Sequence, residues 1–464
     1  MRAGAADAIE AKGAPGKSRP APHARHGGNG PAGRSARQCA GIGCDVPSTT
    51  VDAGLLYYHE NGRVQATEPT LNLTQQVDEN SVFTLGFSAD SVTGATPLGA
   101  VPSTLPQTYV RPYKVIPLGT LVTVTTASGG AVVRLIPPAT GATSQTLSAT
   151  TTVPANTYPL DKSFKDLRYA AHVGWQQTLD AGYTVDGGLA YSKEHDYRSE
   201  SANLGISKDF NQHNTTLNAG VNYESDLSFP LGGTPTPLAV MSGDWKGPNA
   251  SRSEVDAVLG LTQVMTRRWL TSLSYSYATS HGYQNDPYKI ISVVDPVSGQ
   301  PLSQLYESRP DSRRKQSIYL MNKVHLALDV VEFDVRAYKD DWGVKSLSAD
   351  LRYRYMLPGS AYLEPHARYY SQGAANFFDY YLVNGQTLPQ YASADTRLAK
   401  LHAVTYGLKF GLPLGEGSEF NIRLEYYEQR GDGFPAFAIG QLRQQNLFPA
   451  LSAATALLGY SYAF

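Results

Sequence analysis

Apolar and polar side chains alternate at every second position through the last residues of the chain. Phe464, Tyr462, Tyr460 and Leu458 occupy one set of alternate positions, and small or polar residues such as Ser461 occupy the other. A period of two places these sets on opposite faces of a β-strand. We therefore predict a terminal strand with one aromatic, apolar face.

The same alternation recurs upstream in segments of about ten to fourteen residues, long enough for tilted strands to cross a bilayer. The predicted strands are 51–60, 67–77, 81–90, 166–179, 182–193, 199–209, 215–224, 252–265, 269–280, 314–327, 330–340, 345–357, 360–371, 398–411, 418–429 and 452–464. Single-chain bacterial barrels have an even number of antiparallel strands. The pattern predicts an all-β fold, a transmembrane antiparallel up-and-down β-barrel of about 16 strands.

The connections between these segments alternate between short and long. The short ones, several with turn-forming residues, are 78–80, 180–181, 210–213, 266–268, 328–329, 357–360 and 412–417. The long ones are about 91–165, 225–251, 281–313, 372–397 and 430–451. Short connections are expected on the periplasmic side and long ones outside the cell. Within 91–165, the stretches 120–126 and 131–136 predict an extra hairpin, and the segment either folds into the lumen or projects from the cell.

Charged residues occupy the face opposite to the apolar face in four of the later strands. A lipid-facing Arg near the bilayer midplane would cost about 2–4 kcal/mol, so we place these charges in the lumen. The candidate lumen-lining residues are Glu332, Asp334, Arg336, Asp350, Arg352, Arg354, Glu364, His366, Arg368, Arg423 and Glu425. Two interpretations stay open: an ion-pair network that neutralises itself and fills the barrel, or a ladder that selects solutes by charge.

The sequence before the barrel is of another kind. Residues 1–48 are basic, rich in Gly, Pro and Ala, and lack periodicity, so we expect a disordered extension before a barrel domain at 49–464. No apolar region of a signal peptide is visible in it, and we expect a misassigned start site or a lost signal. Cys39 and Cys44, both in this extension, form either a local disulfide or an inert pair.

Composition agrees with a barrel. Tyrosine is abundant, with 30 residues against 14 Phe and 4 Trp, which suits rings at the membrane interface. A run of about eighteen apolar residues, which a spanning helix needs, is absent. The formal charge of −1 and the lack of a basic, aromatic-interleaved cluster give no reason to expect a nucleic acid partner.

Signals for catalysis and for cofactors are weak. Ser280, His281 and Asp286 share one predicted outer loop, but a Ser-His dipeptide is common by chance, and no catalytic site is predicted. The histidines lack metal-ligand spacing, and we expect neither a metal nor a cofactor. Polar roles at the rim or in the lumen are expected for His195, His213 and His366; the acidic loop residues Asp90, Asp244 and Asp286 lack the spacing of a calcium loop.

Several motifs, in order along the chain, resemble an uncharacterised family of bacterial outer-membrane β-barrel proteins known only as a domain of unknown function. They are Tyr57-Tyr58-His59-Glu60, 90–97 (DSVTGATP), 192–199 (SKEHDYRS), 209–216 (DFNQHNTT), 363–378 (LEPHARYYSQGAANFF) and 420–427 (FNIRLEYY). The resemblance spans nearly everything after residue 50. It implies a barrel of this kind and supplies no substrate or catalytic residues.

Together these observations predict a bacterial outer-membrane barrel, most simply a porin-like channel or transporter for small hydrophilic solutes. The alternatives are a closed structural or adhesive surface barrel and, with less support, an outer-membrane hydrolase. The expected partners are outer-membrane lipid, small solutes, and the barrel-assembly machinery. That machinery would recognise the terminal strand through Tyr460, Tyr462 and Phe464.

Overall fold

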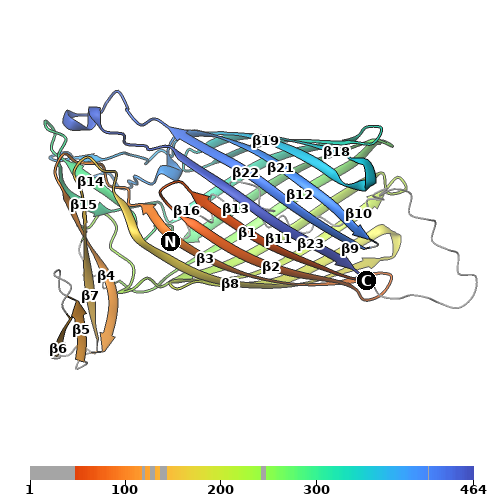
Figure 1. Cartoon of the computed structure of the whole chain (residues 1–464), viewed down its shortest axis with the longest axis horizontal. Helices are drawn as coiled ribbons and strands as arrows, with labels where there is room; N and C mark the ends of the chain where they lie inside the picture. The colour runs from red at the N-terminus through yellow and green to blue at the C-terminus, as the bar shows by residue number, and fades with distance from the viewer. Residues whose placement is uncertain (1–47, 118–120, 126–130, 136–143, 242–246, 416) are drawn as a thin grey trace, which may run out of the picture.

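The computed structural model describes residues 48–464 except 118–120, 126–130, 136–143, 242–246 and 416. In this part of the chain, sixteen strands form a closed antiparallel barrel, which confirms the predicted fold and strand number (Figure 1). In wall order the strands are β1 (Thr49–Glu60), β2 (Gln65–Gln76), β3 (Ser81–Pro97), β8 (Leu160–Leu179), β9 (Tyr183–Lys193), β10 (Tyr197–Phe210), β11 (Thr215–Ser228), β12 (Ala250–Thr266), β13 (Trp269–Gly282), β16 (Ser312–His325), β17 (Val330–Asp340), β18 (Lys345–Met356), β19 (Tyr362–Gln372), β21 (Leu401–Gly415), β22 (Ser418–Gly431) and β23 (Leu451–Ala463).

The first and last strands close the ring. β1 pairs with β23 from Thr50 opposite Ala463 to Glu60 opposite Ala453. At the end of the ladder the Thr49 N–H donates to the Phe464 carbonyl at 2.8 Å, and the Phe464 N–H donates back to the Thr49 carbonyl at 2.9 Å. Closure leaves no strand edge with unpaired backbone groups.

The predicted alternation sorts side chains between the two faces of the wall. On β18 the side chains of Leu347 and Leu351 are 50 % and 46 % exposed, whereas Asp350 between them is 4 % exposed. Leu204 on β10 and Leu259 on β12 are likewise exposed on the outer face. The barrel thus presents apolar side chains outward around its wall. Among the described residues no helix is long and apolar enough to cross a membrane.

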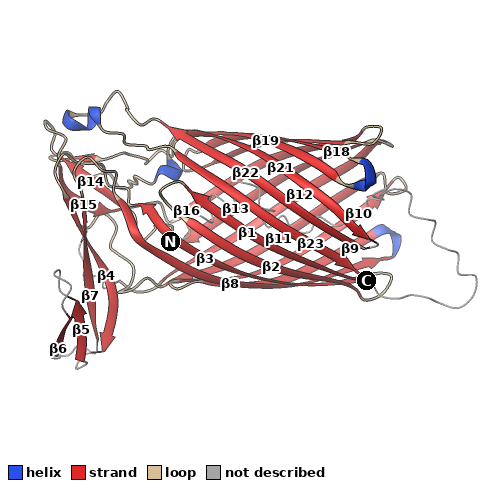
Figure 2. Cartoon of the chain, viewed as in Figure 1, coloured by secondary structure: helices blue, strands red, loops and turns tan. Residues whose placement is uncertain are grey.

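The connections separate by length between the two ends of the barrel. The C-terminus lies at the end with the short turns, two of which contain the 3₁₀ turns η1 (Asp180–Gly182) and η2 (Pro358–Ser360) (Figures 1 and 2). The long connections lie at the opposite end, together with the short turns at 61–64, 194–196 and 341–344. We call the end with the long connections the mouth.

The long segment predicted at 91–165 is shorter than expected, because β3 continues to Pro97 and β8 begins at Leu160. The predicted hairpin is present as β5 (Leu121–Thr125) paired with β6 (Ala131–Leu135). A second ladder, β4 (Gln107–Pro117) with β7 (Ser144–Val153), was not predicted. Figure 1 shows these four strands projecting away from the barrel end, so they lie outside the lumen. The predicted disordered extension and its two cysteines fall outside the described residues, as does Asp244.

Smaller elements lie in the other long connections. β14 (Ile290–Val294) pairs with β15 (Pro301–Tyr306) in antiparallel fashion and with β20 (Leu382–Val383) in parallel. The 3₁₀ turns η3 (Thr396–Leu398) and η4 (Gly440–Gln444) lie nearby at the mouth (Figure 2). The connections at this end are therefore folded and packed.

Deletion of Phe464 should impair assembly. The deletion removes both terminal main-chain hydrogen bonds to Thr49, about 0.5–1.5 kcal/mol each, and the ring stacked on Tyr462 at 5.3 Å. The measurement is the fraction of membrane protein that shows heat-modifiable migration. Phe464→Ala keeps the main-chain hydrogen bonds to Thr49 and removes only the aromatic ring. Comparison of the two variants therefore separates the effect of strand pairing from the effect of ring recognition by the assembly machinery. Unchanged folding of the deletion would contradict this role of the C-terminus.

Candidate functional site: the barrel interior and its mouth

The eleven candidate lumen-lining residues occupy the inner face of one part of the wall. They lie on β17, β18, β19 and β22, with β21 between the last two. We call the inner faces of these five strands the charged arc. Neighbouring positions on the same strands point outward, and Phe333, Leu351, Tyr369 and Leu424 are exposed there. The eleven candidates comprise five carboxylates, five guanidinium groups and one imidazole: Glu332, Asp334, Arg336, Asp350, Arg352, Arg354, Glu364, His366, Arg368, Arg423 and Glu425.

His366 is the centre of this network. Its Nε2 lies 2.8 Å from Asp350 Oδ2 on β18, and its Nδ1 lies 3.1 Å from Glu425 Oε1 on β22. The second contact crosses β21 at Gly407, where an added Cβ would lie 2.9 Å from Glu425 Cγ. A glycine is needed there because any side chain would block the crossing. The imidazole thus ties three strands together.

Ion pairs extend the network on both sides of His366. Arg352 lies 3.2 Å from Asp350 and 3.0 Å from Glu332. Glu364 lies 2.8 Å from Arg354 and 4.0 Å from Arg423. Most charges of the arc are therefore compensated within it, as the ion-pair interpretation expects.

Three of the eleven candidates stand outside these pairs. In the part of the chain that the structure describes, Asp334, Arg336 and Arg368 have no oppositely charged group within 4.0 Å. The Arg336 guanidinium lies 5.1 Å from the centre of the Tyr319 ring and is solvent-exposed although it faces inward. Water therefore reaches the inner face at this position.

The inner face of β8–β12 differs from the charged arc in bulk. Most residues in its middle are small, with His172 and Val258 as bulkier exceptions. We call this face the small-residue arc, after its small residues Ala170, Gly174, Gly188, Ala190, Ser201, Asn203, Gly205, Gly220, Asn222 and Gly260. Polar side chains lie flat over the glycines of neighbouring strands. A Cβ at Gly205 would lie 2.3 Å from Asp186 Oδ1, and one at Gly260 would lie 2.3 Å from Asn218 Oδ1. This side of the interior is therefore left comparatively clear, a feature that our sequence analysis missed.

The long connections meet across the mouth. We define the cap as the segments 98–106, 283–311, 373–400 and 432–450. The Ile290 N–H donates to the Leu98 carbonyl at 3.0 Å, and the Gln441 amide donates to the Gly299 carbonyl at 3.0 Å. Four wall strands separate β8 from β13, and four separate β16 from β22, so these contacts join distant parts of the ring. The cap thus spans the opening.

An apolar core holds the cap together. Ile291, Val294 and Leu442 are fully buried, and Val101 is 3 % exposed. These residues come from connections that leave the wall at different places. Their burial favours the cap over separate, solvated loops.

Six charged residues lie beside this core, and three of them, Glu307, Asp395 and Lys289, are buried. The group contains equal numbers of carboxylates and cations: Asp286, Glu307, Asp395, Lys289, Arg309 and Arg397. Arg309 lies 2.8 Å from both Glu307 and Asp395. Although burial alone would raise the pKa of Asp395, the positive charges of Arg397, Lys289 and Arg309 hold it far below its ordinary value. The cluster is neutral as a whole, which offsets the cost of burying its members.

Ser280, His281 and Asp286, which were considered as catalytic candidates from the sequence, do not form a hydrogen-bonded triad. Gln284 donates to Ser280 Oγ at 3.0 Å, His281 lies 3.3 Å from Thr279 Oγ1, and Asp286 pairs with Arg397 at 3.3 Å. No hydrogen bond joins Ser280, His281 and Asp286, all of which the structure describes.

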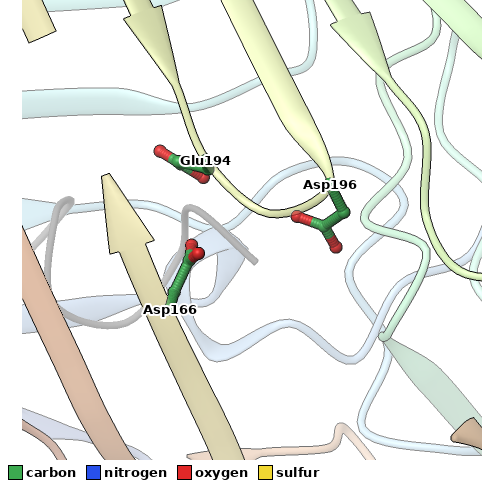
Figure 3. A group of neighbouring side chains, drawn as sticks. All are labelled: Asp166, Glu194 and Asp196. Atoms are coloured by element: carbon green, nitrogen blue, oxygen red, sulfur yellow. The ribbon is translucent and has the colours of Figure 1, made fainter. Parts of the chain in front are cut away.

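A group of carboxylates that was not singled out from the sequence lies where the small-residue arc reaches the mouth. Asp166, at the mouth end of β8, and Glu194 and Asp196, in the β9–β10 turn, point toward a shared space (Figure 3). One carboxylate oxygen of each lies within 4.8 Å of the others. Oxygen donors of this kind suit a hard divalent cation. The acidic residues considered from sequence do not gather: Asp90 pairs with Arg168, and Asp286 belongs to the cap cluster.

Arg309→Met should loosen the cap. The change leaves the buried Glu307 without its main cation and removes one of three cations from Asp395, a loss of about 3–5 kcal/mol for a buried pair. Amide hydrogen exchange over 283–311 and 373–400 should accelerate. The matched control is Arg314→Met, because the Arg314 side chain is 66 % exposed and its pair with Asp341 is expected to contribute about 0–1 kcal/mol. Equal protection in both variants would contradict the role of the cluster.

The solved structures with similar overall arrangement are remote in sequence. A bacterial polysaccharide outer membrane secretin is 8 % identical over 90 % of this chain and 98 % of its own, with a TM-score of 0.42. Pseudomonas aeruginosa OpdK with vanillate is 10 % identical over 90 % and 99 %, with a TM-score of 0.37. OccK2 (OpdF) of the same organism is 11 % identical over 90 % and 98 %, also with a TM-score of 0.37. The assignment of the barrel rests on the strand pairing of this chain.

No curated protein sequence matches the chain. The sequence pattern of one family matches residues 38–462, which is nearly all of the predicted barrel domain and a short part of the extension. The match agrees with the resemblance seen in the sequence motifs. The chain belongs to the family described as "Protein of unknown function (DUF3570)".

Proposed function

We propose that the protein is a channel of the bacterial outer membrane that passes small hydrophilic solutes. The observation that supports this most is the small-residue arc inside a closed wall of sixteen strands. A barrel of this size can enclose an aqueous channel. The small-residue arc leaves room beside the compensated charges of the opposite arc.

The outer face supports a lipid environment. Exposed leucines and tyrosines surround the wall, and the ring has no open edge among the described strands. Only helices and closed barrels satisfy all backbone groups within a bilayer. In our proposal the short turns face the periplasm, the mouth faces the outside, and the assembly machinery recognises the terminal strand.

A closed structural or adhesive barrel is the second candidate. It is favoured by the cap, whose buried core spans the mouth, and by the ion-pair network of the charged arc. In the channel proposal, solutes pass between the cap and the small-residue arc. The two functions therefore differ in whether the folded barrel conducts.

Planar-bilayer recording of the full chain tests the proposal. Stepwise ion currents from heat-modifiable protein are expected. Ala190→Trp should lower the single-channel conductance, because Ala190 faces inward on β9 between Ser201 and His172 of the neighbouring strands. The matched control is Ala257→Trp, whose side chain lies on the outer face beside the exposed Val255 and Leu259 and should leave the conductance unchanged.

Absence of current from correctly folded protein would overturn the channel and leave the structural barrel. Equal currents from Ala190→Trp and the unchanged protein would show that solutes do not follow the small-residue arc. Heat-modifiable migration of each variant checks that the barrel has folded.

A further inference from the structure

The two arcs of the inner face differ in charge as well as in size. The charged arc balances its carboxylates with guanidinium groups. The inner face of β8 from Asp166 onward and of β9–β12, with the turn at 194–196, has nine carboxylates and two guanidinium groups, a formal charge of −7. The residues are Asp166, Asp186, Glu194, Asp196, Asp209, Glu224, Asp226, Glu254, Asp256, Arg168 and Arg252.

Alternation assigns these side chains to the interior. The intervening residues Leu167, Leu189 and Val255 are exposed on the outer face at 46 %, 62 % and 41 %. Consecutive residues of a strand point to opposite faces. The acidic side chains therefore line the same surface as the glycines and alanines of the small-residue arc.

Ion pairs join several of these carboxylates to cations of the same face and of the neighbouring strand β16. Arg252 lies 3.5 Å from Glu224 and also bonds Asp226, and Lys315 of β16 lies 2.5 Å from Glu254. Arg168 is shared with Asp90 on β3. The nine carboxylates of this inner face outnumber its two guanidinium groups, whereas the eleven candidates of the charged arc include equal numbers of both.

Negative charge is densest where the arc reaches the mouth. Glu194 and Asp196 are 7 % and 4 % exposed, and with Asp166 they surround the shared space in Figure 3. On the same inner face, two residues before Glu194, the Ser192 hydroxyl is buried and has no hydrogen-bond partner in the part of the chain that the structure describes. A cation in the shared space would meet carboxylate oxygens from Asp166, Glu194 and Asp196.

We propose that the water path follows the small-residue arc and selects small cations. This inference rests on the proposed channel and adds its substrate class. Carboxylates facing an aqueous path raise the local concentration of cations and repel anions, as rings of acidic side chains do in cation channels. The opposite arc contributes little net field because its eleven candidates include equal numbers of carboxylates and guanidinium groups.

The test is the reversal potential of the full chain across a planar bilayer with a KCl gradient. The unchanged protein should prefer K⁺ to Cl⁻. The double variant Glu224→Gln with Asp256→Asn removes two negative charges from the small-residue arc. It should lower the ratio of K⁺ to Cl⁻ permeability roughly two-fold or more, the effect of a unit charge about 10 Å from an ion in water.

The matched control removes the same two groups from the charged arc, as Glu332→Gln with Asp334→Asn. Its permeability ratio should change less than that of the first double variant. Preference for Cl⁻ in the unchanged protein, or equal shifts in both variants, would overturn the cation path while leaving the channel intact. No current from the unchanged protein would instead overturn the channel itself.

A second variant tests the mouth of the path. Asp166→Asn with Glu194→Gln and Asp196→Asn should lower K⁺ conductance at low ionic strength and have less effect at high salt, because salt screens the attraction of the mouth for K⁺ arriving from solution. None of these three residues lies on β1 or β23, the strands whose pairing closes the barrel. Heat-modifiable migration of the variant verifies that it has folded. A conductance that is equal to that of the unchanged protein at low salt would exclude this cluster from the path.

Discussion

The closed backbone ladder is the constraint on which the rest of this structure depends. A strand edge in lipid would expose unpaired N–H and C=O groups at a cost of several kcal/mol each. The pairing of β1 with β23, completed by reciprocal bonds between Thr49 and Phe464, removes that edge. Once the ring is closed, every wall residue faces either lipid or the interior, and the chemistry of its side chain is restricted accordingly.

The restriction explains why so many charges gather inside. Each strand needs apolar residues at alternate positions for lipid, and the remaining positions are free for polar residues. In the charged arc this freedom is used for packing: His366 joins Asp350 and Glu425 across Gly407. In the small-residue arc it is used for clearance, because Asp186 and Asn218 lie flat over glycines of neighbouring strands.

The wall could be predicted from the sequence because its rule is local. Alternation placed β18 and β22 within one or two residues of their observed ends, and turn-forming residues marked the short connections. The predicted boundaries were wrong for β3 and β8. Both strands extend beyond the predicted segments because they pair with each other as far as Pro97 and Leu160. That pairing between distant segments is not visible in either strand alone.

The interior could be predicted only in part, since contacts between strands and loops far apart in sequence decide it. The charges of β17–β19 were assigned to the lumen, but a glycine such as Gly205 has no local signal that a neighbouring carboxylate covers it. The acidic group of Asp166, Glu194 and Asp196 likewise depends on the register of β8 with β9.

The cap follows from the same closure. A ring that must stay closed in lipid cannot open or shut by separating its strands, so any control of passage has to come from the connections at its mouth. In this chain those connections pack into a defined structure. It contains an apolar core around the buried Leu442 and a charge-balanced cluster around Arg309. Both are interactions that favour one packed arrangement over a set of loose ones. In the channel that we propose, the closed wall would fix the path and the packed cap would fix access to it.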